Sequence, residues 1–517
     1  MLPIHHFEMD GARTQTRFIG IDAIFQYAGS VAQIFSGLVF YLIAVRLFSL
    51  SSIGAIALFL AIVGLFNILF SFGLSTASQH FTSYSLGMGD YDTARKIIYR
   101  ILFFSVGLSL AGLFTLQILA SYISTLLLHS PKYIETVRVL GIVLFGNTMF
   151  GILNGVVLGL QRFRLSAIIS VIIWVTYYFG AIMFALYMKS ISAIVFGWMI
   201  GIFTGVIIEL IVILLPIKKH RGKGNPPPNL VILKYSVPVL FSSLISYGAA
   251  YADRFIVSGL LNLASLGVYN FALLIASAIS FLSIPFNNIL LPKFSEFFGR
   301  GDKEKIRSTA EISATLLSYF YVPSALGIAA LSPIILNILA GSEYISGSMP
   351  LRIIMFFTAL FITQNILIQA IASIKKTRLF LYSSFLSLMG NIIISIVLIP
   401  PLGLIGASLG FSSVYVITFA ILYYFARKEY VLSLDIKGIT KIWLAAILMF
   451  SIVNYFSLLF GSYPIYLPFY IFIGTAIYII LTKIMGIFRV ESKELILSIF
   501  PSKLGILKRL LLLLVLH

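Results

Sequence analysis

The sequence predicts an all-α, polytopic membrane protein with about 14 transmembrane helices. Of its 517 residues, 60% are hydrophobic and only 10% are charged, whereas about a quarter of a soluble chain is charged. The mean hydropathy is +1.05, and the apolar residues form runs long enough to cross a bilayer. This composition excludes a soluble globular protein, a disordered chain and, since the chain has no cysteine, a disulfide scaffold or thiol enzyme.

Fourteen charge-poor runs, separated by turns or basic clusters, are the predicted spans. They lie near residues 19–47, 53–79, 97–128, 139–160, 165–188, 191–215, 235–261, 266–292, 310–340, 349–374, 379–400, 403–426, 440–461 and 464–487. Two of the boundaries depend on turn residues alone, at Pro400–Gly403 and Gly461–Pro464. The first run is too long for a cleavable signal peptide and is therefore counted as a span.

Basic residues set the predicted orientation. Thirty of the 36 Lys and Arg residues lie in alternate connections or at the termini, and the remaining six lie on the other side or in the outer half of the membrane. Because positively charged connections stay inside, the chain is predicted to be a multi-pass protein of the cytoplasmic membrane with both termini cytoplasmic. The net charge of +19 is thereby explained by topology, and no nucleic-acid partner is expected.

The chain contains an internal duplication. The pattern G-x-G-D-x-[D/E]-x-x-R occurs at Gly87–Arg95 and again, 212 residues later, at Gly299–Arg307. The sequence therefore predicts two six-helix repeats, parallel because six is even, which form two lobes and are followed by two extra helices. The predicted boundaries are 1–217 for the first lobe, 218–232 for a basic, proline-rich cytoplasmic linker, 233–428 for the second lobe, 429–490 for helices 13 and 14, and 491–517 for an interfacial tail. Parallel repeats of this kind are typical of transporters.

The repeated motif resembles a phosphate-binding loop or a metal-binding D-x-D, but a structural role accounts for it. Asp90 and Asp302 stand where they would N-cap the following helix, and Asp92 and Glu304 then fall in its first turn. The phosphate loop would need a preceding strand, and neither copy is near a soluble domain. We therefore expect no catalytic residue and no metal site, and a protein that is not an enzyme.

Charges inside the spans are the strongest candidates for function, because each is costly in a bilayer unless it faces a cavity or a partner. Five such residues are Asp22, Arg46, Glu209, Asp253 and Arg254. Two alternatives remain open, since Arg46 is near enough to the outer surface to snorkel and Glu209 is near enough to the cytoplasmic end to pair with a basic residue of the linker, Lys218 or Lys219.

Polar residues extend these charges along helix faces. In the first span, Gln26 and Gln33 share a face with Asp22, and in the seventh, Ser243 and Tyr247 share a face with Arg254. Because consecutive residues on a helix do not face each other, Asp253 and Arg254 are expected to contact different neighbours. Three amides elsewhere in the spans are predicted either to line a cavity or to join helices, namely Asn67, Asn287 and Gln364.

Several stretches resemble a known family. Tyr235–Pro238, Tyr251–Ile256 and Leu266–Tyr269 are similar to the seventh and eighth spans of the Wzx-like polysaccharide-biosynthesis flippases. Arg46–Phe48 and Ile53–Gly54 are similar to the corresponding part of the first repeat. These flippases belong to the multidrug/oligosaccharidyl-lipid/polysaccharide (MOP/MATE) exporter superfamily, and the fourteen spans and the repeat extend the resemblance over nearly the whole chain.

The resemblance implies a flippase that moves a polyprenyl-pyrophosphate-linked oligosaccharide from the cytoplasmic to the outer leaflet by alternating access of the lobes. It implies that Arg46 and Arg254 meet the pyrophosphate, since arginine pairs with phosphate oxygens. Asp22, Asp253 or Glu209 would then take a coupling proton or sodium ion, and no other cofactor is expected. The expected partners are membrane lipid and the lipid-linked glycan, with a glycan polymerase or a glycosyltransferase as candidate protein partners, and the protein is expected to be a monomer.

Three other functions remain open at this point. A MATE-type proton- or sodium-coupled exporter of cationic compounds would use the same carboxylates, and a flippase for the peptidoglycan lipid precursor would share the fold. An integral-membrane glycan polymerase or transferase would need an acidic or metal site in a large outer loop. All the predicted outer connections are short, and the longest is near Leu128–Val137.

Overall fold

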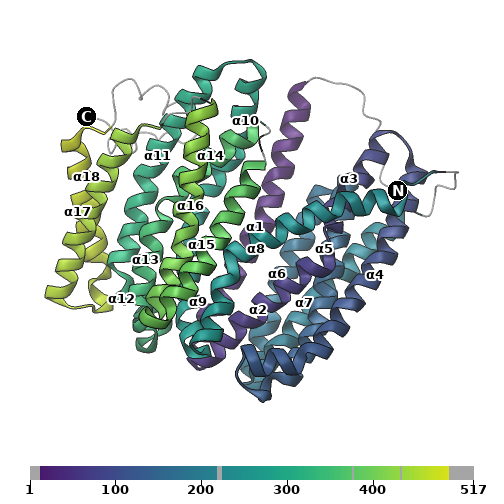
Figure 1. Cartoon of the computed structure of the whole chain (residues 1–517), viewed down its shortest axis with the longest axis horizontal. Coiled ribbons are helices and arrows are strands. Elements are labelled where there is room, and N and C mark those ends of the chain that lie inside the picture. The colour runs from purple at the N-terminus through teal and green to yellow at the C-terminus, as the bar shows by residue number, and fades with distance from the viewer. Residues whose placement is uncertain (1–11, 218–223, 375, 377, 431–433, 488–517) are drawn as a thin grey trace. The chain divides into compact units, whose positions relative to one another are not determined.

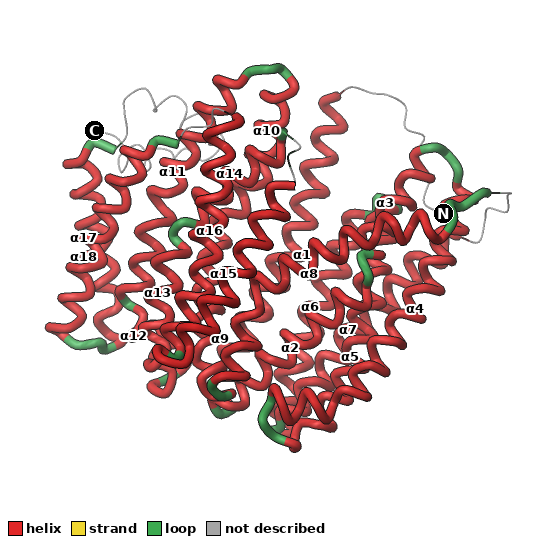
Figure 2. Tube along the Cα trace, viewed as in Figure 1, coloured by secondary structure: helices red, strands yellow, loops and turns green. Residues whose placement is uncertain are grey.

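The computed structural model describes residues 12–217, 224–374, 376, 378–430 and 434–487, and in this part of the chain the regular elements are helices without a strand (Figures 1 and 2). The side chains at 12–24, 215–217, 281–282, 284–289 and 429–430 are not described. Thirteen helices among the described residues are long and apolar enough to span a membrane, and Leu263–Ala278 is a shorter apolar helix. The predicted all-helical class with about 14 spans is thus confirmed.

The chain divides into two units, and the first comprises Met1–Ser49 and Leu58–Leu244. Its helices are α1 (Ala12–Leu47), most of α2 (Leu50–Ser71), α3 (Leu74–Gly87), α4 (Tyr91–Tyr122), α5 (Ile134–Gly159), α6 (Phe163–Met188), α7 (Ile191–Ile217) and the first half of α8 (Asn229–Leu260). A π-turn, Ile123–Leu127, and a 3₁₀ turn, Pro131–Tyr133, connect α4 to α5. Within the unit, α6 packs against α1 and α7, and α5 packs against α3, α4 and α7.

The second unit comprises Leu50–Ala57 and Ile245–His517. Its helices after α8 are α9 (Leu263–Ala278), α10 (Ile284–Gly299), α11 (Lys303–Ala330), α12 (Ser332–Ala340), α13 (Ser348–Thr358), α14 (Phe361–Ser373), α15 (Arg378–Leu402), α16 (Leu404–Tyr430), α17 (Ile436–Phe460) and α18 (Leu467–Met485). Short 3₁₀ turns are Ile279–Ser283, Ser342–Gly347 and Pro464–Tyr466. Helix α16 packs against α13, α14 and α15, and the last two helices, yellow in Figure 1, pack against each other and against α11.

The capping role of the repeated motif is confirmed in both copies. Asp90 accepts a hydrogen bond from the Thr93 amide at 2.9 Å, and Asp302 accepts one from the Lys305 amide at 3.1 Å. The side chains of Thr93 and Lys305, together with these backbone amides, lower the pKa of both carboxyls. The preceding Gly89 and Gly301 have φ values of +74° and +72°, a conformation that favours glycine, which explains why a glycine precedes the aspartate in each copy.

Two glycines account for the close contact of the first turns of α2 with α9, inside the second unit. A Cβ atom on Gly54 would lie 1.8 Å from the Leu263 carbonyl oxygen, and one on Gly267 would lie 2.2 Å from the Leu50 carbonyl oxygen. Helices that approach this closely need small residues at the contact. The Ile53–Gly54 and Leu266–Tyr269 stretches noted in the sequence therefore have a packing role.

The eighth span differs from the prediction. Residues 266–292 were expected to form one helix, but α9 ends at Ala278 and α10 begins at Ile284. The second span is broken in the same way, because α2 ends at Ser71 and Phe72 and Gly73 both have positive φ. Both breaks lie at equivalent positions of the two repeats, so the interruption is a feature of the repeat. Hydropathy alone is continuous across such a break and does not reveal it.

The two boundaries predicted from turn residues are confirmed, since α15 ends at Leu402 before Gly403 (φ +56°) and α17 ends at Phe460 before Gly461 (φ +87°). The described end of the linker is held by α4, because Lys96 and Arg100 donate to the carbonyl oxygens of Gly224 and Pro227. The interfacial tail, 491–517, lies outside the described residues. The lobe boundaries and the orientation stay predictions.

Candidate functional site

A polar cluster in the second unit is centred on Arg254, in the second half of α8. Its Nη1 donates to the Ala250 carbonyl oxygen at 2.8 Å and lies 3.4 Å from Asp253 Oδ1, and its Nε donates to Asn270 Oδ1 at 3.3 Å. The guanidinium carbon lies 4.3 Å from the centroid of the Tyr251 ring, a cation–π distance. The group is therefore anchored through Nε and Nη1, while Nη2 has no hydrogen-bond partner among the described residues.

Asp253 completes this cluster from a fully buried position. Its side chain is 0% exposed, and its Oδ2 accepts a hydrogen bond from the Tyr269 hydroxyl at 2.7 Å. The expectation that Asp253 and Arg254 contact different neighbours was wrong. The arginine side chain is long enough to fold back toward the preceding turn of α8, where one of its nitrogens reaches both Asp253 and Ala250. In a buried site the attraction between the two charges favours this arrangement.

The other predicted residues of α8 lie on the face that carries Arg254. Tyr247 stacks on Tyr251 with ring centroids 4.4 Å apart and an angle of 9° between the ring planes. Ser243 lies one turn before Tyr247 and is half-buried. Tyr251 was not singled out from the sequence, although its spacing of four residues from Tyr247 places it on the same face.

Glu209 lies at the centre of a second polar cluster, inside the first unit. Its side chain is 0% exposed, and its Oε1 accepts a hydrogen bond from Asn154 Nδ2 at 2.9 Å. The same amide also donates to Ser166 Oγ at 3.1 Å. Glu209 Oε2 is buried and has no hydrogen-bond partner among the described residues. The alternative partners, Lys218 and Lys219, lie outside the described residues.

The candidates in the first spans are more exposed. Arg46 is exposed in the last turn of α1, the position expected of an arginine that reaches the headgroups. Gln26 donates to the Phe163 carbonyl oxygen at 2.6 Å and so joins α1 to α6, while Gln33 is exposed. Asn67, on α2, is half-buried with an unpartnered Oδ1. Asp22 lies in α1 and Asn287 in α10, but their side chains are outside the described residues.

Sequence reasoning missed a polar face on α3. His80 stacks on Tyr235 of α8 with ring centroids 4.8 Å apart and a 6° angle between the planes. Tyr84, one turn further along the same face, stacks on His80 with ring centroids 6.2 Å apart, and both Tyr84 and Gln79 are exposed. The signal was present, because residues 75–85 are rich in Ser, Thr, Gln, His and Tyr within an apolar run. These residues face away from the hydrophobic core, which contains Leu74 and Ala77 from the same helix.

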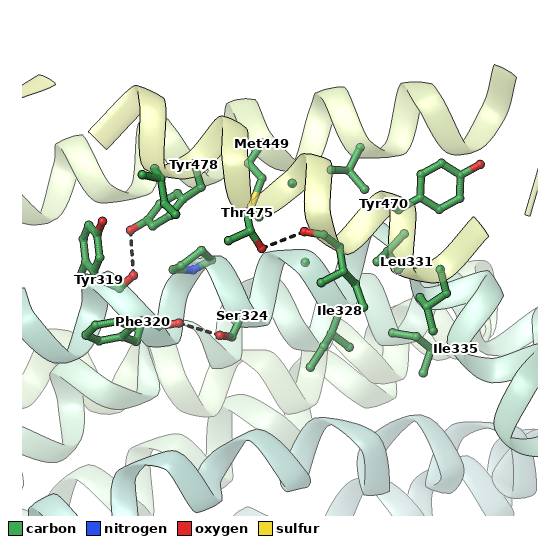
Figure 3. A pocket seen from close by; sticks show the side chains of 17 residues that line it. Tyr319, Phe320, Ser324, Ile328, Leu331, Ile335, Met449, Tyr470, Thr475 and Tyr478 are labelled. Atoms are coloured by element: carbon green, nitrogen blue, oxygen red, sulfur yellow. Dashed lines mark hydrogen bonds between the residues drawn. The ribbon is translucent and has the colours of Figure 1, made fainter. Parts of the chain in front are cut away.

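A cavity of about 410 Å³ lies between α11, α12, α17 and α18 (Figure 3). Most of its lining is apolar, with Ile328, Leu331 and Ile335 on one side and Met449 on the other. Its few polar groups are used within the protein, since the Tyr478 hydroxyl donates to the Tyr319 carbonyl oxygen at 2.8 Å. Because none of the described lining residues is charged, the cavity suits an apolar chain and not an ion.

A second cavity, of about 380 Å³, lies between α8, α14, α15 and α16. Its lining includes Gln364, the predicted amide on α14, which is 7% exposed and whose Oε1 is buried without a hydrogen-bond partner among the described residues. Ala250, whose carbonyl oxygen accepts from Arg254, also lines this cavity. The structure therefore brings Gln364, Asp253 and Arg254 into one region of the second unit.

A family described as polysaccharide biosynthesis protein matches residues 43–349. A probable low-salt glycan biosynthesis flippase, Agl15 of Haloferax volcanii, is 23% identical over 177 residues, which are 34% of this chain and 38% of that protein. The chain thus spans well under half of the length of that relative.

Solved structures share the fold. The lipid II flippase MurJ in an inward closed conformation has a TM-score of 0.68 at 17% identity and covers 92% of this chain and 99% of its own. An inward-facing multidrug resistance MATE family transporter of the MOP superfamily has a TM-score of 0.67 at 14% identity and covers 79% of this chain and 98% of its own. At these identities the likeness concerns the fold, which is that of these multi-pass membrane transporters.

Proposed function

Since the chain belongs to the polysaccharide biosynthesis protein family, we propose that it is a flippase that moves a polyprenyl-pyrophosphate-linked oligosaccharide from the cytoplasmic to the outer leaflet. The family match over residues 43–349 includes Tyr251–Ile256, one of the stretches that resemble the Wzx-like flippases. We place the protein in the cytoplasmic membrane with both termini inside, in accordance with its basic connections. It acts as a monomer without chemistry of its own.

The observation that carries this proposal is that the Arg254 guanidinium is held by the protein at two of its nitrogens and has no partner among the described residues at the third. A buried arginine in a transmembrane helix is costly and marks a functional position. Its Nε and Nη1 are held by the protein, whereas Nη2 has no partner among the described residues and the side chain is 13% exposed. A guanidinium edge of this kind is a strong donor to a phosphate oxygen. Arg254 therefore binds the pyrophosphate. Arg46, which is exposed at the end of α1, contacts a lipid headgroup or the same substrate.

The apolar cavity in Figure 3 supports a lipid-carrying substrate. It lies between transmembrane helices and is lined mainly by aliphatic and aromatic side chains, so a polyprenyl chain could enter it from the bilayer without leaving an apolar environment and would pack against it through dispersion contacts. The two extra C-terminal helices, α17 and α18, supply half of its lining.

Glu209 is the carboxylate best suited to take the coupling proton or sodium ion. Asp253 is paired with Arg254 and accepts from Tyr269, so its charge is already compensated. Glu209 has one oxygen bound by Asn154 and one oxygen without a partner, and a buried polar atom in that state is costly. A proton or a cation at Oε2 would remove that cost.

A deletion strain tests the proposed function directly. Loss of the protein should cause complete lipid-linked oligosaccharide to accumulate, with less glycan at the surface, as measured by mass spectrometry of extracted polyprenyl lipids. The likeness to the solved MATE family transporter supports a second candidate function, that of a proton- or sodium-coupled exporter of cationic compounds. Unchanged lipid-linked pools together with new sensitivity to cationic compounds would support the exporter and refute the flippase. Co-purification would show whether a glycan polymerase or a glycosyltransferase is a partner.

A further inference from the structure

The cavity between α8, α14, α15 and α16 combines hydroxyl and amide groups with aromatic rings. Three serines of α15, Ser383, Ser384 and Ser387, lie on one side, and Phe411 and Tyr415 of α16 lie on another. None of the described residues that line it is charged. Ligand pockets typically have this composition, in which apolar and aromatic surface is combined with a few polar groups that fix the orientation.

Several polar groups of the cavity are already hydrogen-bonded, whereas the buried amide oxygen of Gln364 is not. Ser387 Oγ lies 2.8 Å from Thr418 Oγ1, and Ser383 Oγ donates to the Phe380 carbonyl oxygen at 3.0 Å. Gln364 is 93% buried, and its Oε1 has no partner among the described residues. Because most buried polar atoms in proteins are satisfied, an unpartnered amide oxygen in a cavity indicates a ligand that donates a hydrogen bond to it.

The chemistry of the lining defines the class of ligand. A charged group placed here would lose its hydration without gaining an opposite charge, which is unfavourable. A neutral sugar ring fits, since its hydroxyls can donate to Gln364 Oε1 and to the oxygens of the serine hydroxyls, which keep acceptor capacity, while its C–H face packs on an aromatic ring. The cavity volume of about 380 Å³ is enough for one such ring.

The position of the cavity relative to Arg254 connects it with the substrate. Ser246 and Ala250 are exposed residues of α8 that line the cavity, and they mark its mouth. The Ala250 carbonyl oxygen accepts from Arg254 Nη1 at 2.8 Å. Arg254 lies one helical turn, about 6 Å, further along α8. A sugar in the cavity and a phosphate attached to that sugar could therefore be held at the same time.

We propose that this cavity binds one neutral sugar ring, the one attached to the pyrophosphate, through Gln364 and the serines of α15. This inference rests on the proposed flippase function and makes it more specific, because it assigns recognition of the first sugar to the second unit. It also implies that a first sugar carrying a carboxylate is disfavoured.

Binding to the purified full-length protein in lipid nanodiscs tests the inference. Three fluorescent probes are compared, namely polyprenyl pyrophosphate without a sugar, with one N-acetylglucosamine and with one galacturonic acid. The wild type should bind the N-acetylglucosamine probe about tenfold more tightly than either other probe, and Gln364→Leu should remove this preference, because the amide oxygen contributes about one buried hydrogen bond. Binding of the bare pyrophosphate should not change.

A second variant distinguishes loss of sugar binding from misfolding of the protein. Ser246→Trp places a large ring at the exposed mouth and should remove the preference, whereas Phe241→Trp, which is exposed on the same helix outside the lining, should retain it. The inference is overturned if Gln364→Leu and Ser246→Trp keep the preference for the sugar, or if they weaken all three probes equally. If the wild type binds none of the probes, the proposed function fails together with the inference, whereas tight binding without any sugar preference removes the inference alone.

Discussion

Replacement of Arg254 tests both the stability and the function of the site in the second unit. Arg254→Met keeps most of the apolar stem of the side chain and removes the charge. The sequence alone places Arg254 as a polar position whose loss should affect transport only. The structure adds a second consequence, because Asp253 is 0% exposed and Arg254 is the cation that pairs with it.

The size of the expected loss in stability follows from the ion pair between Asp253 and Arg254. After the replacement, the Asp253 carboxylate keeps the hydrogen bond from Tyr269 but loses its counter-charge. Removing one partner of a buried ion pair costs about 3–5 kcal/mol, since it leaves an uncompensated buried charge. The double variant Arg254→Met with Asp253→Asn removes both charges, and it should recover to within about 1 kcal/mol of the wild type because a neutral amide also accepts from Tyr269.

Two assays separate the consequences. Size-exclusion chromatography in detergent reports stability as the fraction of protein that stays monodisperse after heating. This assay is chosen because the chain has no cysteine for a thiol-reactive dye to label. Flipping of a fluorescent lipid-linked oligosaccharide in proteoliposomes reports transport. The single variant should be unstable and inactive, and the double variant stable and inactive. A stable single variant would refute the assigned ion pair, and an active double variant would refute the role of Arg254 in binding the pyrophosphate.

Four further predictions concern other parts of the chain. Glu209→Gln should retain folding, because the amide oxygen of the new side chain still accepts from Asn154 Nδ2. It should abolish the dependence of flipping on a proton or sodium gradient, and unchanged dependence in proteoliposomes would exclude Glu209 as the coupling residue. Asp90→Ala should lower thermal stability at neutral pH. Because the pKa of Asp90 is below its ordinary value of 3.8, the stabilisation that the Asp90 carboxylate provides is present above pH 3.8 and is lost as the pH falls through the lowered pKa. Asp90→Asn, which also caps helices, should keep the stability of the wild type at neutral pH. Gly54→Ala should destabilise the protein by about 1–3 kcal/mol through overpacking against Leu263, whereas Gly259→Ala, with open space around the added methyl, should leave thermal stability unchanged. Gly327→Leu, which adds a side chain in the apolar cavity, should slow flipping of a long-chain polyprenyl substrate and spare a short-chain analogue, and equal rates for both would show that the cavity does not hold the lipid.

Local features of this protein could be predicted from the sequence because they depend on a few neighbouring residues. Asp90 and Asp302 cap helices through a spacing of three residues, and Gly403 ends a helix through its own backbone conformation. The fold class follows from composition, and the repeat from two copies of one motif. The break in the eighth span was missed because its residues are as apolar as those of a continuous helix.

The composition of the sites depended on tertiary structure. Glu209 meets Asn154 from 55 residues away and His80 stacks on Tyr235 of another helix, and no spacing in the sequence indicates which helix faces will meet. Gln364 was recognisable as an amide inside a span, yet only the packing of α8, α14, α15 and α16 shows that its oxygen is buried in a cavity without a partner. Asp253 and Arg254 could be selected from the sequence by their charge. Their ion pair forms because the site is buried, since removal of water strengthens the attraction between the two charges. That attraction outweighs the unfavourable geometry of consecutive residues on a helix.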